Sequence, residues 1–203
     1  MPSPPAPRKR PRQRRAVITF DAIVEAAERV LRERGLEAFN TNAVAERAGV
    51  SIGSLYQYFP DKDALMAEIV RRDAARFLAS LAAAAPPEAE PREALHALID
   101  RAVAHQLDDP ALAAIIDAEQ ARLPLDDEDA ALRGEIVALV AGTLARLDPA
   151  PSGPAVAAID LLGIARGLLD TAALEGERDA ARVRRRLERA AFGYLGLREP
   201  AGR

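Results

Sequence analysis

Cysteine is absent from the 203-residue sequence, and histidine occurs only twice, as His96 and His105. Without cysteine the chain can form no disulfide, no thiolate metal site and no cysteine nucleophile. Two histidines leave little material for a zinc site or for a proton-shuttling catalytic triad. The sequence also lacks a GxSxG nucleophile elbow and a phosphate-binding loop. We therefore expect neither an enzyme nor a bound cofactor or metal.

Long apolar runs are missing too, because no stretch approaches the roughly 20 residues needed to cross a bilayer. The start of the chain is basic, but a proline-broken polar segment follows it, so no secretory signal is expected. These absences predict a soluble, cytoplasmic protein with no membrane partner. The chain is nevertheless long enough to bury a sizeable core.

Lysine is scarce, since only Lys9 and Lys62 occur among the 28 basic residues. Charge is also unevenly distributed. Residues 1–62 carry 11 basic and seven acidic side chains, a net charge of +4, whereas residues 63–203 carry 17 and 24, a net charge of −7. Five of the eight aromatic residues lie within the first 59 positions. A basic front and an acidic remainder indicate that only the front meets a polyanion.

No segment alternates with period two for long enough to form a strand, so the sequence predicts an all-α fold of about nine helices. Residues 1–15 are rich in proline and arginine and are expected to form a disordered basic arm. Thr19 is the expected N-cap of the first helix, and Gly35 is its expected stop. The later helices are expected at about 41–48, 51–59, 62–84, 91–107, 110–123, from 126 onward, 155–174 and 179–195.

One short predicted helix is unusual in this alanine-rich chain, because AGVSIGSLYQYFPDK (48–62) carries glycine, serine and tyrosine. At about 100° per residue, Leu55 and Phe59 fall on one face, which predicts their burial. The opposite arc and its flank offer small, planar and hydroxyl-bearing groups, which suit insertion into the major groove of DNA. These groups belong to Ile52, Gly53, Ser54, Tyr56, Gln57 and Tyr58.

The preceding segment fits the same role. A short helix, a glycine able to adopt positive φ (Gly49) and a second helix capped by Ser51 follow the plan of a helix-turn-helix. The run NTNAVAERAGVSIGSLYQYFPDK at 40–62 resembles the TetR-family DNA-binding signature, and the likeness extends into DALMAEIV. The resemblance implies a three-helix DNA-binding domain at 16–62 and a helical effector-binding and dimerisation domain at 63–203.

By position, the resemblance implies base-edge contacts from Ile52, Gly53 and Tyr56. Two departures from the family pattern stand out: Asn40 replaces a commoner threonine, and Ile52 replaces a frequent polar or basic reader, so readout there would be apolar or by shape. On pattern alone, Ile52 also fits a core position, Tyr56 half-buried packing and Lys62 a solvated charge. Contacts to phosphate, with an adjoining base at the first two positions, are implied for Thr41, Asn42, Ser51, Ser54, Gln57, Tyr58 and Lys62.

The arginine-rich segment RKRPRQRR at 8–15 has two interpretations. It can act as a flexible arm that enters a minor groove or grips phosphates, which would give binding a strong salt dependence. It can equally be a solvated tail without a specific role. Both interpretations stay open from the sequence.

The last two predicted helices are implied to pair with their copies in a four-helix homodimer interface. Gly163 and Gly167 lie four residues apart and would allow a neighbouring helix to approach closely. Ordinary packing within one chain is the alternative. The apolar stripes of this pair are formed by Ile159, Leu162, Leu169, Val183, Leu187, Ala190 and Ala191.

An effector cavity is implied among the helices from about 62 to 175. Small, alanine-rich surfaces and few aromatic residues favour an apolar effector. Arg166 and Asp170 also fit a simple surface pair at i, i+4. The candidate polar lining residues are His96, His105, Asp117, Gln120, Thr143, Asp160 and Arg166.

Together these features imply a ligand-responsive, DNA-binding transcriptional regulator, in this family most often a repressor that a small-molecule effector releases from a palindromic operator. An enzyme is one alternative, which the absences above oppose. A helical scaffold whose helix-turn-helix contacts protein is another. Salt-dependent, sequence-specific binding to double-stranded DNA would separate the regulator from the scaffold.

Overall fold

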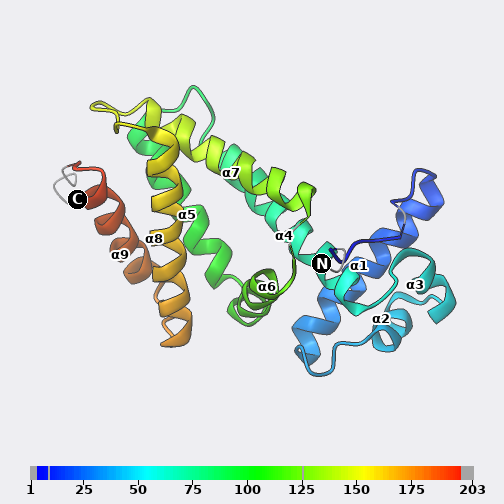
Figure 1. Cartoon of the computed structure of the whole chain (residues 1–203). Helices are drawn as coiled ribbons and strands as arrows, with labels where there is room; N and C mark the ends of the chain where they lie inside the picture. Colours follow the sequence, from blue (N-terminus) through cyan, green and yellow to red (C-terminus); the bar gives the residue numbers. More distant parts are fainter. Residues whose placement is uncertain (1–3, 9, 125, 198–203) are drawn as a thin grey trace. The chain divides into compact units, whose positions relative to one another are not determined.

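The structure, a computed structural model, describes residues 4–8, 10–124 and 126–197. This part of the chain is all-helical, as predicted, and nine helices follow one another in it without a strand (Figure 1). By their contacts the helices group into two compact units. The first covers the chain up to Asp73 together with Ala111–Asp129, and the second covers Ala74–Pro110 and the chain from Ala130 onward.

The first unit contains α1 (Arg14–Arg34), α2 (Thr41–Ala48) and α3 (Ile52–Tyr58), and the chain continues into α4 (Lys62–Ala84). Local rules fix the helix ends. Asn40 accepts a hydrogen bond from the backbone N–H of Ala43 at 2.9 Å and so caps α2. Gly49 ends α2 in the left-handed conformation, with φ 68° and ψ 28°, and Ser51 caps α3. The predicted break at Gly49 and the predicted cap at Ser51 are confirmed, whereas the cap at Asn40 was not predicted.

Helix α6 (Pro110–Arg122) also belongs to the first unit. Its buried side chains Leu112 and Ile116 join the core that α1 and the start of α4 form around Phe20 and Phe59. The two phenylalanine rings stack with centroids 4.9 Å apart. The first unit is therefore assembled from two segments that lie about 40 residues apart in the sequence. The predicted boundary at residue 62 would assign the second of these segments, with α6, to the other domain. That division by function stays a prediction.

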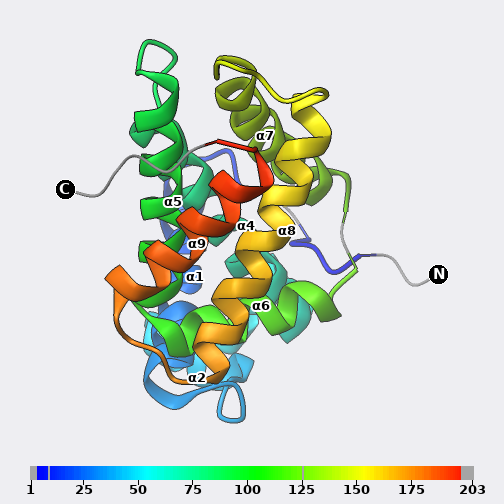
Figure 2. The ribbon, with the colours of Figure 1, turned by 90° about the vertical axis from the view of Figure 1, so that its left-hand side faces the viewer.

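The second unit contains α5 (Pro91–Leu107), most of α7 (Asp127–Ala145), α8 (Pro154–Leu174) and α9 (Ala180–Tyr194). Helices α8 and α9 run side by side, and α5 packs against both (Figures 1 and 2). Its core is aliphatic apart from Phe192, and Leu144 and Ala158 are fully buried there. The ends of α4 and α5 agree with the predicted ranges.

One predicted boundary is wrong. Helix α1 begins at Arg14 instead of after Thr19, whose hydroxyl donates to the carbonyl oxygen of Arg15 inside the helix at 3.1 Å. No side-chain cap marks the true start, because Gln13 makes no capping hydrogen bond. Arginine is itself a good helix former, so the arginine pair at 14–15 extends the helix without a cap.

Candidate nucleic-acid interface

Helix α3 has one buried face and one exposed face. Leu55 and Phe59 have no exposed surface, whereas Ile52 is 37% and Tyr56 is 42% exposed. Gly53 and Gln57 are exposed as well, and a side chain at position 53 would meet only the Ser51 hydroxyl within 4 Å. Ile52 is therefore not a core residue, and the outward arc predicted from the helical spacing is present.

Hydroxyl groups pair along the edge of this face. The Thr41 and Tyr56 hydroxyls lie 3.2 Å apart and join the start of α2 to the middle of α3. The Ser51 and Ser54 hydroxyls lie 2.8 Å apart. In each pair either oxygen can donate, so each pair keeps donor and acceptor capacity for a further partner such as a phosphate.

The ten predicted DNA-contacting residues all lie on three consecutive elements of the first unit. Asn42, Gln57 and Lys62 are exposed, and Tyr58 is half-buried with its ring edge-on to Phe20 at a centroid distance of 6.0 Å. Asn40 is used as a helix cap, which explains why an asparagine can replace the commoner threonine at that position. The ten residues lie on α2, on α3 and its N-cap residue, and on the first residue of α4, and they are Thr41, Asn42, Ser51, Ile52, Gly53, Ser54, Tyr56, Gln57, Tyr58 and Lys62.

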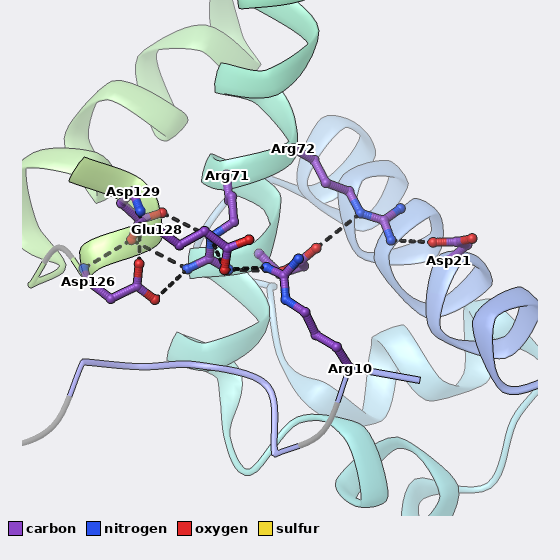
Figure 3. A network of polar contacts seen from close by, with 8 residues as sticks. Arg10, Asp21, Arg71, Arg72, Asp126, Glu128 and Asp129 are labelled. Carbon is purple, nitrogen blue, oxygen red and sulfur yellow. Dashed lines mark hydrogen bonds and ion pairs between the residues drawn. The ribbon is translucent and has the colours of Figure 1, made fainter. Parts of the chain in front are cut away.

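The first unit also holds a buried ionic network that sequence reasoning missed (Figure 3). The Arg71 side chain on α4 is only 6% exposed and donates to Glu68 at 3.0 Å, to Asp129 at 3.0 Å and to Asp126 at 2.9 Å. Arg72, the next residue, pairs with Glu68 at 3.4 Å and with Asp21 on α1. The double arginine three residues after Glu68 in MAEIVRRDAA is the signal of this network in the sequence.

The network shifts the pKa values of its members. Burial disfavours the charged Arg71, but Asp129, Asp126 and Glu68 outweigh it and raise the pKa of the guanidinium. Burial raises the pKa of Asp129. Burial acts in the same direction on Asp126, but a hydrogen bond from the Asp129 backbone N–H and the charge of Arg71 lower its pKa instead. The start of α7 is thereby tied to α4 by charge.

A second ionic tie joins α6 to the start of α4. Arg122 donates to Asp63 at 2.8 Å and to the buried Glu119 at 2.7 Å. The hydrogen bond that Arg122 donates lowers the pKa of Asp63, and the hydrogen bonds to Asp63 and Glu119 raise the pKa of Arg122. Asp63 directly follows Lys62, so the tie holds the first turn of α4 next to the predicted phosphate-facing edge.

The predicted effector-lining residues do not gather in the same way. Asp117 and Gln120 belong to α6 in the first unit, and the other five belong to the second. His96 is held by Glu188 at 2.7 Å, and Asp160 accepts a hydrogen bond from Tyr194. Arg166 lies on the surface beside Asp170, at 3.7 Å, as the i, i+4 spacing suggested.

Two of these residues face the interior of the second unit. Thr143 is buried and donates to the Leu139 carbonyl oxygen of its own helix at 3.3 Å. The His105 ring stacks on Phe77 with centroids 4.6 Å apart. In the part of the chain that the structure covers, no three His, Cys, Asp or Glu side chains are arranged to hold a metal ion. No helix there combines the length and hydropathy needed to span a bilayer.

Comparisons with known proteins agree with this geometry. Residues 23–69 match the family model described as bacterial regulatory proteins, tetR family. Residues 90–195, about half of the chain, match the model of the tetracyclin repressor-like C-terminal domain. The chain belongs to the TetR family. It is accordingly a DNA-binding transcriptional regulator and not an enzyme.

Individual relatives support the same assignment. An uncharacterized HTH-type transcriptional regulator of Mycobacterium tuberculosis strain H37Rv is 33% identical over 136 residues, which span 67% of this chain and 66% of that protein, just under two thirds. The HTH-type transcriptional repressor KstR of Mycolicibacterium smegmatis is 42% identical over 69 residues, or 32% of this chain and 34% of KstR. This TetR-family chain is thus related to curated regulators mainly through part of its length.

Solved structures show the same fold over nearly the whole chain. A TetR-family transcriptional regulator from Streptomyces coelicolor superimposes with a TM-score of 0.70 at 23% identity, covering 89% of this chain and 97% of that one. The fatty acid degradation regulator FadR from Bacillus halodurans superimposes with a TM-score of 0.69 at 18% identity, covering 88% and 100%. The all-α TetR architecture therefore extends through both units.

Proposed function

We propose that this TetR-family regulator is a homodimeric repressor that binds a palindromic DNA operator and is released from it by a small-molecule effector. The observation that best supports this function is that α3 and its C-cap have two faces. Leu55 and Phe59 form the buried face, and the exposed face includes Ile52 and Tyr56. Because its target is chromosomal DNA, we place the protein in the cytoplasm.

On this proposal α3 enters the major groove. Ile52, Gly53 and Tyr56 read base edges, with the isoleucine side chain suited to a thymine methyl group and the glycine permitting close approach. The surrounding polar groups bind phosphate and set the register of the helix on the duplex. They are Thr41, Asn42, Ser51, Ser54, Gln57, Tyr58 and Lys62.

The dimer is proposed to form through α8 and α9. Several large apolar side chains remain exposed on this pair, including Val156, Ile159 and Leu174 at 62%, 57% and 89%. Gly163 and Gly167 are exposed on α8, with open space where a side chain would stand. Other residues of the predicted stripes are buried in the core of their own chain, so we assign the interface to the exposed face of α8 that includes Ile159, Gly163 and Gly167. The buried residues are Leu169, Val183, Leu187 and Ala191.

A dimer is what the reading of a palindrome requires. One recognition helix reads only a few base pairs, whereas two helices placed about 34–36 Å apart read successive major grooves. An effector would then act by binding more tightly to a conformation in which that spacing is lost. Helix α4 is the proposed carrier, because its residues are divided between the two compact units.

The effector is proposed to be apolar and to bind within the second unit. The buried polar residues of that unit, Gln106 and Thr143, are uncharged, and the surrounding core is aliphatic. We favour Thr143 and His105 as lining residues, because Thr143 is buried and the His105 ring stacks on Phe77 at the core of that unit. His96, Asp160 and Arg166 of the same unit rank after them, and Asp117 and Gln120 rank last because they belong to the first unit.

Selection of bound duplexes from random DNA with the purified full-length protein tests this function. The expected product is an inverted repeat whose half-sites lie about one helical turn apart. Lys62→Ala should then weaken binding to the selected duplex about equally at all sequences and reduce the salt dependence by about one phosphate contact. Recovery of no enriched sequence, or of a single unrepeated half-site, would contradict the proposed function.

A thermal-shift screen tests the effector class separately. Apolar compounds should raise the unfolding temperature and lower affinity for the selected duplex, because ligand binding and DNA binding are reciprocal. A screen in which charged compounds stabilise the protein instead would contradict the apolar assignment.

A further inference from the structure

The basic arm before α1 is docked on the first unit at two points. The first is the end of the proposed recognition helix, where the backbone N–H of Arg8 donates to the carbonyl oxygen of Tyr58 at 2.8 Å. The last carbonyls of a helix have no partner within the helix, so this hydrogen bond satisfies one of them. The arm is thus fixed beside α3; Lys9, within it, lies outside the described residues.

The second point is the buried ionic network, where Arg10 acts as an anchor (Figure 3). Its guanidinium lies 3.4 Å from Glu68 on α4 and 2.9 Å from Glu128 in the first turn of α7. The Glu68 side chain is only 5% exposed and is shared with Arg71. Arg10 therefore compensates a carboxylate that is largely removed from water, which favours the docked position.

The side chain of Arg8 is in a different situation. It is exposed, and among the described residues it has no hydrogen-bond or ion-pair partner. Its backbone is nevertheless held against Tyr58, one of the proposed phosphate-binding residues. A guanidinium presented from a fixed backbone loses less conformational entropy on binding than one on a free tail, and it matches phosphate geometry well.

We propose that Arg8 is a further DNA-phosphate contact, and that Arg10 is a positioning residue which holds Arg8 in place through Glu68 and Glu128 without touching DNA. This inference rests on the proposed binding of DNA by α3. It assigns different roles to neighbouring arginines of one arm, whereas a flexible arm would use its arginines interchangeably.

The first test compares Arg8→Ala with Arg12→Ala, a matched loss of one positive charge from an exposed arm residue that the structure leaves without a described partner. Binding of a fluorescein-labelled duplex carrying the selected inverted repeat is measured by anisotropy over a range of salt concentrations. Arg8→Ala should make the negative slope of log K against log salt shallower by about 0.9 per protomer. Arg12→Ala should reduce the steepness of this slope clearly less. Equal effects of the two variants would overturn the proposal in favour of a flexible arm.

The second test uses the sign of a charge effect. Glu128→Gln removes a negative charge from an exposed side chain, so simple electrostatics predicts tighter binding to DNA. The proposal predicts weaker binding, because Arg10 loses its closer partner and Arg8 is positioned less well. Unchanged or tighter binding would overturn the proposal, and tighter binding would indicate instead that the acidic residues draw the arm away from DNA.

A double-mutant cycle completes the assignment. Arg10→Met should weaken binding in the wild-type background, and Arg8→Ala should then cost less in the Arg10→Met background than alone. Additive losses would mean that Arg10 contacts DNA independently, which contradicts its positioning role. Failure of the wild-type protein to bind any duplex selectively would instead reject the proposed function, so the two failures are distinguishable.

Discussion

The two compact units differ in what they bury. In the described part of the chain, the buried charged residues Glu68, Arg71 and Glu119 all lie in the first unit. The buried polar residues of the second unit, Gln106 and Thr143, are neutral. Burying paired charges contributes little net stability, but it penalises any arrangement in which the pairs are broken. Buried ion pairs between side chains therefore fix the geometry of the first unit, whereas apolar packing mainly holds the second.

This contrast corresponds to the roles that we propose for the two units. A recognition surface has to present groups at fixed positions, and the ion pairs of Arg71 and Arg122 hold α4, α6 and the start of α7 together. A site for an apolar effector needs adaptable walls, which aliphatic side chains supply. The following predictions compare matched positions in the two units, beginning with the largest expected effect.

Phe59→Ala should be the most damaging of these substitutions. Phe59 has no exposed surface and stacks on Phe20, so its removal leaves a cavity and should cost about 3–5 kcal/mol of unfolding free energy. Phe77→Ala makes the same change at a half-buried position in the second unit and should cost clearly less. Urea denaturation followed by circular dichroism measures both. A larger loss for Phe77→Ala would show that the better-packed core lies in the second unit.

Arg71→Met tests the ionic difference directly. It leaves the buried Glu68 with only its contacts to Arg10 and Arg72, and Asp126 and Asp129 without their central partner. We expect a loss of about 3 kcal/mol, because unpaired charges remain in a largely buried site. Arg166→Met breaks a 3.7 Å surface pair in α8 and should change stability by less than about 0.5 kcal/mol. Similar losses in urea denaturation would remove the contrast between the units.

What could be predicted from the sequence depended on whether a residue acts through near or through distant neighbours in the chain. In residues 40–62, Gly49, Ser51 and the spacing of Leu55 and Phe59 act through neighbours within four residues. The helix ends and the exposed face of α3 could therefore be predicted from local rules. Both glycine positions 35 and 49 adopt positive φ, as their places at helix ends required. The start of α1 was missed because it has no side-chain cap that a local rule could detect.

The roles of polar residues in the longer helices depend on partners far away in sequence. His96 is hydrogen-bonded to Glu188, which lies 92 residues further along the chain. Arg71 donates hydrogen bonds to Asp126 and Asp129, which lie 55 and 58 residues further along. Helical periodicity states which face of a helix a residue occupies, but not which helix covers that face. For this reason the predicted effector residues were dispersed by the structure, whereas the predicted DNA-contacting residues were brought together.

Two glycine substitutions should have opposite effects on the protomer. Neither Gly49 nor Gly163 has an atom within 4 Å of the position that a new Cβ would occupy, so only the backbone distinguishes them. Gly49→Ala forces alanine to φ 68° and should cost about 1–2 kcal/mol. Gly163→Ala lies inside α8 and should stabilise an isolated protomer by about 0.5–1 kcal/mol.

The control for this pair is oligomeric state. If α8 forms the proposed interface, Gly163→Ala should also weaken dimerisation in analytical ultracentrifugation, because the added methyl group prevents close helix approach. Gly49→Ala should leave dimerisation unchanged. A tighter or unaffected dimer with Gly163→Ala would move the interface away from this glycine.

The smallest expected effect concerns two carboxylates whose pKa values are lowered by different means. A hydrogen bond from the Arg122 side chain lowers the pKa of Asp63 in the first unit. Hydrogen bonds from the Glu93 and Arg92 backbone N–H groups lower the pKa of Glu90, which caps α5 in the second. A lowered pKa means that each group stabilises the fold above its ordinary value of 3.8 or 4.5, and that this stabilisation is lost as pH falls through the folded-state value.

Asp63→Asn and Glu90→Gln should therefore each reduce the acid sensitivity of the unfolding free energy between about pH 5 and pH 3. Salt distinguishes the two mechanisms, because it screens a partly exposed ion pair but hardly affects a backbone hydrogen bond. The difference between wild type and Asp63→Asn should shrink in about 1 M salt, whereas the difference for Glu90→Gln should persist. If both differences shrank equally, side-chain charge would govern both positions, and the contrast between an ion-tied first unit and a second unit held by packing and backbone caps would fail at these two sites.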